Sequence, residues 1–404
     1  MKTSGRPVRV LLQTGGVIPD PSSVFIDPAV VPERIAPKTL IHPFCRIYGA
    51  QTSIGPGCEL GAEGPVTIEN CQLGERVKLA GGYFSGSVFL NDSSMGNCAR
   101  VRPGALLEEF ASGAHAVGLK QTLLFPYVTL GSLVNFCDCL TAGGTGRKNH
   151  SEVGSAYVHF NFTPHQDKAT PSLIGDVPRG VLLDQPPVFL GGQGGLAGPA
   201  RVAFGAIAPA GMIIRGDVSA AGLVVRGEQP KPAGGRFIAG AYRTIDRIVR
   251  NNLIYIGNIY ALKAWYRHVR STFMGRDSFQ AACLAGALEK LDLIIRERIG
   301  RLDELAGKMP RSIELNEKSG GGAASYLQQQ KKLCGQWPEM KDNLLQIAGV
   351  EGDPAKRDHL LEEITAGQKS SYLETIAAIS SASRQDATEW LQSIVDRTAE
   401  IWKK

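Results

Sequence analysis

Long apolar runs are missing from this chain of 404 residues. A membrane-spanning helix needs about 20 consecutive apolar residues, and the opening stretch, MKTSGRPVRVLLQTGG, has no apolar run long enough for export. We therefore expect neither a membrane span nor a secretory signal peptide.

Paired cysteines and a dominant charge are missing as well. The eight cysteines show no CxxC spacing, which argues against a zinc or redox motif. Together with the missing export signal, this predicts reduced thiols, a cytoplasmic location and no metal site. The net charge of +6 comes from 44 basic and 38 acidic residues, so it does not favour nucleic acid as the main partner.

Tryptophan is missing from the first 232 residues, and proline is scarce after them. All four tryptophans follow Pro232, whereas 20 of the 23 prolines lie at or before it. A turn-rich part is therefore followed by a part suited to helices. We predict a lead-in or cap over residues 1–39, a solenoid domain over 40–232 and an α-helical domain over 233–404, packed on the end of the solenoid.

Small aliphatic residues recur every six positions between Arg100 and Gly216, usually followed by glycine. Leu130-Gly131, Val153-Gly154 and Ile174-Gly175 mark this period. A six-residue period fits neither a helix nor an alternating strand, but it is typical of a hexapeptide β-solenoid. Glycine and small polar residues are expected at the corners, where the backbone turns sharply. The predicted fold is a left-handed parallel β-helix followed by a C-terminal α-helical domain.

Helical periodicity begins after the solenoid pattern ends. Apolar residues three and four apart predict helices over 236–275 and, most clearly, over 277–308. The basic residues of the first helix are typical of a solvated face. A nucleic-acid-binding helical module is a weaker alternative, because it rests on that face alone.

Polar residues interrupt the small-residue pattern in the central coils, where a solenoid has no structural need for them. Three of the seven histidines lie within 150–165. The segment 141–150, TAGGTGRKNH, combines glycine with Arg147 and Lys148. It is either a loop whose backbone N–H groups wrap a phosphate or a flexible surface loop.

Several stretches together resemble a known family. They are VRPGALLEEFASGAHAVGLKQ at 101–121, HFNF at 159–162, SLIGD at 172–176, and VFLGGQGGLAGPARVAFGAIAPAGMIIRGDV at 188–218. They occur in the order found in the left-handed β-helix acyltransferases, and they resemble the glucosamine-1-phosphate N-acetyltransferase half of the bifunctional enzyme that makes UDP-N-acetylglucosamine. The uridyltransferase half has no counterpart here.

The resemblance implies roles for individual residues. Arg102 and Lys120 stand where the family binds the sugar phosphate, and charge-assisted bonds from both would orient such an anion. The other implied substrate residues are Asn135, Asp138, Asn161, Phe162 and Lys168. The positions implied for coenzyme A are Gly192, Ala210 and Arg226.

One departure from the family concerns its general base, a histidine followed three residues later by tyrosine. Asn135 and Asp138 occupy those positions here, and an amide cannot take a proton from an amine. His150, His159 or His165 could act as a relocated base, because imidazole titrates near neutral pH. The alternative is that these histidines only form hydrogen bonds or bind substrate.

We therefore expect an acyltransferase-like protein that binds a sugar phosphate or nucleotide sugar. If it is active, it would transfer an acetyl group from acetyl-CoA to an amine. The alternative is a non-catalytic sugar-nucleotide-binding or structural solenoid. The family resemblance implies a homotrimer with the site between neighbouring β-helices.

Overall fold

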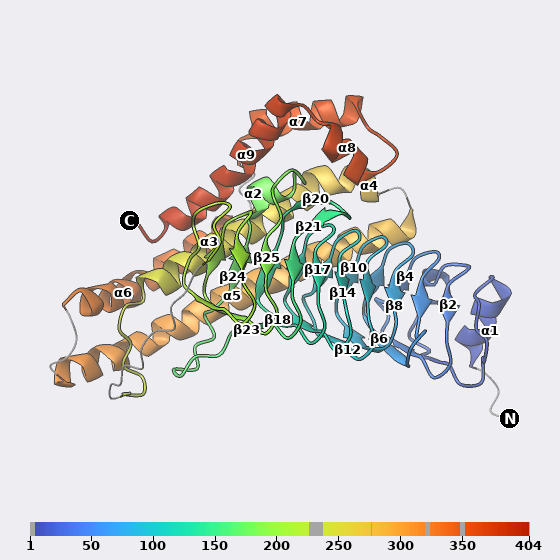
Figure 1. The fold of residues 1–404 in the computed structure, drawn as a ribbon, viewed down its shortest axis with the longest axis horizontal. Coiled ribbons are helices and arrows are strands. Elements are labelled where there is room, and N and C mark those ends of the chain that lie inside the picture. The colour runs from blue at the N-terminus through green and yellow to red at the C-terminus, as the bar shows by residue number, and fades with distance from the viewer. Residues whose placement is uncertain (1–4, 226–236, 276, 320–323, 348–351, 404) are drawn as a thin grey trace.

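The computed structural model describes residues 5–225, 237–275, 277–319, 324–347 and 352–403. Strands from Phe25 to Arg215 form a parallel β-helix, and helices follow it from Asp246 onward (Figure 1). The predicted fold class, a left-handed parallel β-helix followed by α-helices, is confirmed.

Three parallel sheets, here named A, B and C, form the sides of the β-helix. Sheet A contains β2 (Leu40–Ile41), β5 (Glu59–Leu60), β8 (Lys78–Leu79), β11 (Ser94–Met95), β14 (Ser112–Gly113), β17 (Thr129–Leu130), β22 (Glu152–Val153), β25 (Phe189–Leu190) and β28 (Ile207–Ala208). Sheet B contains β1 (Phe25–Ile26), β3 (Arg46–Tyr48), β6 (Val66–Glu69), β9 (Gly82–Ser85), β12 (Ala99–Val101), β15 (Gly118–Lys120), β18 (Asn135–Cys137), β23 (Val158–Phe160), β26 (Gly195–Ala197) and β29 (Ile213–Arg215). Sheet C contains β4 (Ser53–Ile54), β7 (Gln72–Leu73), β10 (Val88–Phe89), β13 (Leu106–Leu107), β16 (Leu123–Leu124), β19 (Cys139–Thr141), β24 (Ser172–Ile174) and β27 (Arg201–Val202).

The coils are close to three hexapeptides long. Ser94 pairs with Ser112 after 18 residues, whereas Lys78 pairs with Ser94 after 16 and Ser112 with Thr129 after 17. Each coil places one strand in each sheet. The segment 141–150 leaves this path as an antiparallel hairpin of β20 (Gly144–Gly146) and β21 (Asn149–His150). A short helix, α2 (Val177–Gly180), follows β24 in a second excursion.

Bulky residues occupy several corners where only glycine or small polar residues were expected. Phe110, Tyr127 and Leu133 all have positive φ values, near 60–71°. That backbone conformation costs of order 1–3 kcal/mol for a residue with a side chain. The N–H of each corner residue donates to a carbonyl of the preceding coil, and the rings of Phe110 and Tyr127 stack 5.6 Å apart. Stacking of successive coils therefore holds these corners.

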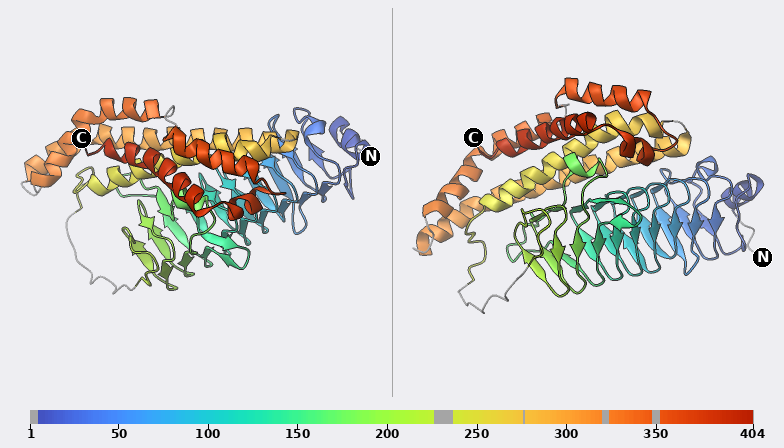
Figure 2. Two further views of the ribbon diagram at one scale, coloured as in Figure 1. Left: turned by 90° about the horizontal axis from the view of Figure 1, so that it is seen from above. Right: turned by 45° about the horizontal axis from the view of Figure 1, so that its top comes forward.

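The helices lie along one side of the β-helix, and the expectation that they pack on its end is wrong (Figures 1 and 2). The N-terminal end carries α1 (Arg6–Gln13) and a short turn, η1 (Pro32–Arg34). Among the later helices, α3 (Asp246–Trp265) continues through a π-helical turn, η2 (Tyr266–Arg270), into α4 (Ser271–Met274). The others are α5 (Ser278–Ser319), α6 (Ala324–Ile347), α7 (Pro354–Ala366), α8 (Tyr372–Ala378) and α9 (Ser381–Glu400). Helix α5 contacts β4, β7 and β10, and α3 contacts β24, so both cover sheet C.

Sheet C differs from the other sheets because both of its faces are buried. Val88, Leu106, Leu123 and Leu140 form one row across successive coils, and all four are buried under the helices. Gly286 of α5 lies directly over β7 and β10, since a Cβ there would come within 3.0 Å of Gln72 and Val88. Burial of this apolar row attaches the helices to the β-helix.

Candidate functional site

Two basic residues lie in register on the outer surface of sheet B, where it meets sheet C. Val101 pairs with Leu119, so the residues that follow them, Arg102 and Lys120, stack on adjacent coils. Lys120 in turn pairs with Cys137 of the next coil, and the Arg102 guanidinium donates to the Cys137 Sγ at 3.3 Å. Arg102 is exposed and Lys120 is half-buried, so a ligand can reach both. We call this place the basic corner.

Helix α5 borders the basic corner, which the sequence does not predict. Arg298 is buried and pairs with Asp138 at 3.1 Å, and it also donates to the Lys168 carbonyl at 3.2 Å. The structure thus brings the predicted residues Asp138 and Lys168 together through a helical residue. One signal could have revealed it: Arg298 falls three and four residues after Ile295 and Ile294, on the apolar stripe of the helix.

Glu297 adds a carboxylate beside the basic corner. It accepts a hydrogen bond from Arg301 at 2.7 Å and is partly exposed. Although burial acts to raise the pKa of Glu297, the hydrogen bonds and charge of Arg301, together with the charges of other cations including Lys120, lower it. Glu297 is therefore ionised at neutral pH and contributes a negative charge near Lys120.

Asn135 lies on the same outer face of sheet B as the basic corner. Phe136 points into the core, so Asn135 and Cys137 face outward two residues apart, about 7 Å along the strand. The Asn135 side chain is exposed. An amide therefore stands where the family resemblance implies the base.

The three candidate histidines lie in different parts of the molecule. His150 belongs to the hairpin that leaves the corner between sheets C and A, where its Nδ1 bonds to the Arg147 carbonyl. His165 lies in the loop after β23, where its ring centre is 4.3 Å from that of Tyr242 and the two rings are tilted against each other. Neither is placed beside Arg102 by any contact in the described part of the chain.

His159 is closer to the basic corner but is enclosed in the β-helix. It is 3% exposed, its Nε2 lies 2.9 Å from the Ser172 Oγ, and Asp138 is near enough to act on its charge. Burial lowers the pKa of His159 to about 4, which makes the ring a weak base. A catalytic role for any of the three histidines remains a prediction.

The remaining predicted residues lie farther along the chain. Asn161 and Phe162 lie in the loop after β23, where the Asn161 carbonyl accepts a hydrogen bond from Thr170 and the Phe162 ring is 64% exposed. Gly192 and Ala210 meet at the corner between sheets A and B, since the Gly211 N–H donates to the Gly192 carbonyl at 2.9 Å. Arg226 and the predicted boundary at 232 lie outside the described residues.

The coils pack closely at the corner of Gly192 and Ala210. A Cβ on the preceding residue, Gly191, would lie 2.3 Å from the Ala210 nitrogen, so the two coils touch there backbone to backbone. Gly192 is half-buried and Ala210 is exposed. The family resemblance implies coenzyme A binding at this corner, and that role stays a prediction.

The implied sites therefore occupy three different corners of one chain. The basic corner lies between sheets B and C, the hairpin with His150 between C and A, and the Gly192–Ala210 pair between A and B. In the described residues, no group of three or more His, Cys, Asp or Glu side chains could hold a metal ion. None of the helices described is both long and apolar enough to span a bilayer.

Comparison with known proteins finds several relatives named bifunctional protein GlmU. The bifunctional protein GlmU of Thermotoga petrophila is 29% identical over 210 residues, which are 52% of this chain and 42% of that protein. GlmU of Pelobacter propionicus is 31% identical over 207 residues, or 51% of this chain and 40% of that protein. The chain resembles GlmU.

The resemblance predicted from the sequence is thereby confirmed, and with the observed fold it describes an acetyltransferase-like β-helix protein. GlmU of Thermus thermophilus is a further relative, with 28% identity over 158 residues, or 39% of this chain and 31% of that protein. The chain covers less than half the length of these GlmU proteins. No family model matches it.

Proposed function

We propose that the basic corner binds a sugar phosphate or a nucleotide sugar. One observation carries this proposal: Arg102 and Lys120 stack on adjacent coils, about 4.8 Å apart along the axis, without a carboxylate within 4 Å of either in the described residues. Two such cations can share one phosphate through charge-assisted hydrogen bonds. The relatives named GlmU support the same class of ligand.

Isothermal calorimetry with glucosamine phosphate and with UDP-N-acetylglucosamine tests this proposal. We expect Arg102→Ala and Lys120→Ala each to weaken binding by about tenfold or more, because each removes a charge-assisted contact. Lys78→Ala is the matched control, since Lys78 is exposed on sheet A. Equal affinities for Arg102→Ala, Lys120→Ala and the control would refute the site.

A second candidate function is acetyl transfer from acetyl-CoA to an amino sugar. The similarity to GlmU favours it. The family resemblance implies that Gly192 and Ala210 would contact coenzyme A. The amine nitrogen would attack the thioester carbonyl and pass its proton to a histidine, and the coenzyme A thiolate would leave and be protonated. Asn135 at the implied base position favours binding without transfer.

Release of the coenzyme A thiol separates the two functions. If transfer occurs, replacing the histidine that serves as base should lower the rate by roughly 10²–10⁴-fold. Ligand binding by calorimetry with no thiol release, in the parent chain and in all His→Ala variants, would establish the binding role and reject the transferase.

We further propose that the protein assembles as a trimer. The three corners that carry the implied sites do not meet in one chain, and a symmetric assembly can bring a corner of one chain against another corner of its neighbour. Since the chain's own helices cover sheet C, contacts between copies would use sheets A and B.

A further inference from the structure

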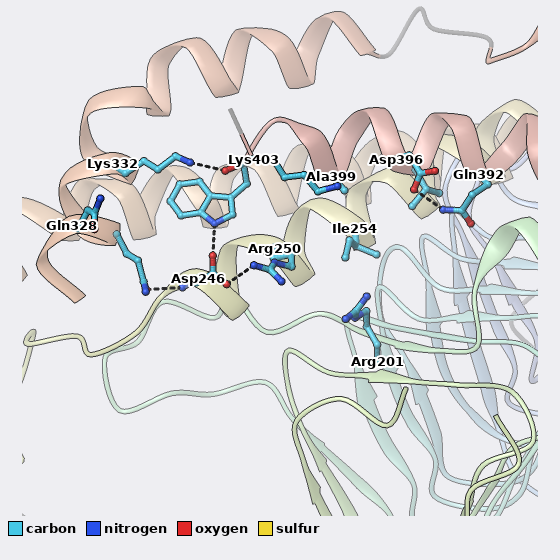
Figure 3. Close-up of a pocket in the computed structure, with 13 residues that line it drawn as sticks. Arg201, Asp246, Arg250, Ile254, Gln328, Lys332, Gln392, Asp396, Ala399 and Lys403 are labelled. Carbon is cyan, nitrogen blue, oxygen red and sulfur yellow. Dashed lines mark hydrogen bonds and ion pairs between the residues drawn. The ribbon is translucent and has the colours of Figure 1, made fainter. Parts of the chain in front are cut away.

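A cavity of about 550 Å³ lies between the helices and the last coils of the β-helix, away from the basic corner. Residues of α3, α6 and α9 line it, and Arg201 of β27 closes one side (Figure 3). The volume matches that of sites for small organic ligands. Nothing in the proposed function uses this cavity.

The cavity has an apolar wall. Ile254 of α3, Val395 and Ala399 of α9, and the Trp402 indole form it. The indole N–H donates to Asp246 at 2.8 Å, which fixes the ring in place. Such a wall suits an aliphatic or aromatic group of a ligand.

Positive groups surround the apolar wall, and two of them have no acidic partner. Arg201 pairs with Asp217, and Arg250 pairs with Asp246. In the part of the chain that is described, no carboxylate lies within 4 Å of the ammonium group of Lys332 or Lys403.

The two lysines differ in what they contact. The Lys332 ammonium bonds to the Trp402 carbonyl at 2.7 Å and lies 4.7 Å above its ring. Lys403 is exposed, and Figure 3 shows it at the end of α9 beside the cavity.

One further carboxylate lines the cavity. Asp396 accepts a hydrogen bond from Gln392 at 2.9 Å. The acidic groups that face the cavity are thus bonded to the protein, whereas the two lysine ammonium groups can still bind an anion. Positive potential beside an apolar wall selects a ligand that has both an apolar body and a negative group.

We propose that this cavity binds a small amphipathic anion, with its apolar body on Trp402 and Ala399 and its acidic group beside Lys332 and Lys403. Arg201 belongs to the β-helix, and the other lining residues belong to α3, α6 and α9 or directly follow α9. A ligand in the cavity would therefore lie between the two parts. Its binding would stabilise the docked arrangement of the helices, as any ligand that binds only the folded state does.

Fluorescence titration of the full chain with ANS, an anilinonaphthalene sulfonate, tests the proposal. We expect saturable binding of one molecule per chain. Ala399→Phe should weaken it by about tenfold or more, because the new ring fills the space against the wall. The double variant Lys332→Gln, Lys403→Gln should weaken ANS binding by a similar factor, yet leave binding of the neutral N-phenyl-naphthylamine unchanged.

Matched controls separate this cavity from other apolar surfaces. Lys318→Gln removes an exposed lysine from α5, and Phe44→Ser removes an exposed apolar residue near the N-terminal end of the β-helix. Neither should change ANS affinity. Circular dichroism checks that Ala399→Phe folds, and the double lysine variant decides the question if it does not. Unsaturable ANS binding, loss of binding in Phe44→Ser, or parent affinity in the double lysine variant would overturn the proposal.

Discussion

At the scale of the residue, burial in the β-helix disfavours the protonated, charged form of His159. The ring is enclosed between sheets B and C and bonds to Ser172. Burial lowers its pKa from 6.5 to about 4 even though the negative Asp138 acts to raise it. The folded protein therefore binds fewer protons at this group than the unfolded chain does between these two values.

The sign of this shift gives a prediction about acid stability. The contribution of His159 is fully present above pH 6.5 and is lost as the pH falls toward 4, by up to about 3 kcal/mol. We expect His159→Gln, which keeps a polar group near the Nε2 position and cannot become charged, to lose less stability over this interval. Urea denaturation at several pH values measures the difference. Parallel pH profiles for the two proteins would contradict the pKa assignment.

At the scale of the element, helix α5 is anchored to the β-helix by the buried Arg298–Asp138 pair. Arg298→Ala leaves the Asp138 carboxylate buried without its partner, so we expect the free energy of unfolding to fall by about 3–5 kcal/mol. Arg296→Ala, on the exposed side of the same turn, is the control and should change it by less than about 0.5 kcal/mol. Chemical denaturation measures both.

Replacing both members of the pair tests the cause of that loss. The double variant Arg298→Met, Asp138→Leu removes the uncompensated charge, so it should recover most of the stability. If it is as unstable as Arg298→Ala, the loss comes from packing of α5 and not from a buried charge.

The sequence predicts the elements better than their docking. The six-residue period identifies the coils, because one aliphatic residue per side must fill the axis. The pairs Leu106-Leu107 and Leu123-Leu124 also indicate that both faces of the strand are buried, because successive residues point to opposite faces. The sequence does not say which helix covers the outer residues, Leu106 and Leu123. The sequence predicts Arg102 and Lys120 of the basic corner. It does not predict Arg298, whose contacts there are with residues more than 100 positions away in the chain.

At the scale of the whole molecule, sheet A retains exposed apolar residues where sheet C has none. Phe189 and Ile207 pair on adjacent coils, and Ile207 bridges to Val224, so the three form a row that is 41–45% exposed. The helices α3 and α5 lie against sheet C. A second copy of the chain is the partner that the proposed trimer would place against this row.

Light scattering after size-exclusion chromatography tests this assembly. At micromolar concentration we expect a mass three times the 43.2 kDa of the chain. Phe189→Glu combined with Ile207→Glu should give monomers, because two carboxylates would be buried in the interface without partners. Phe44→Glu, at an exposed position near the N-terminal end, should remain trimeric. A parent chain that elutes as a monomer would reject the trimer, and a trimeric double variant would show that the copies meet through another surface.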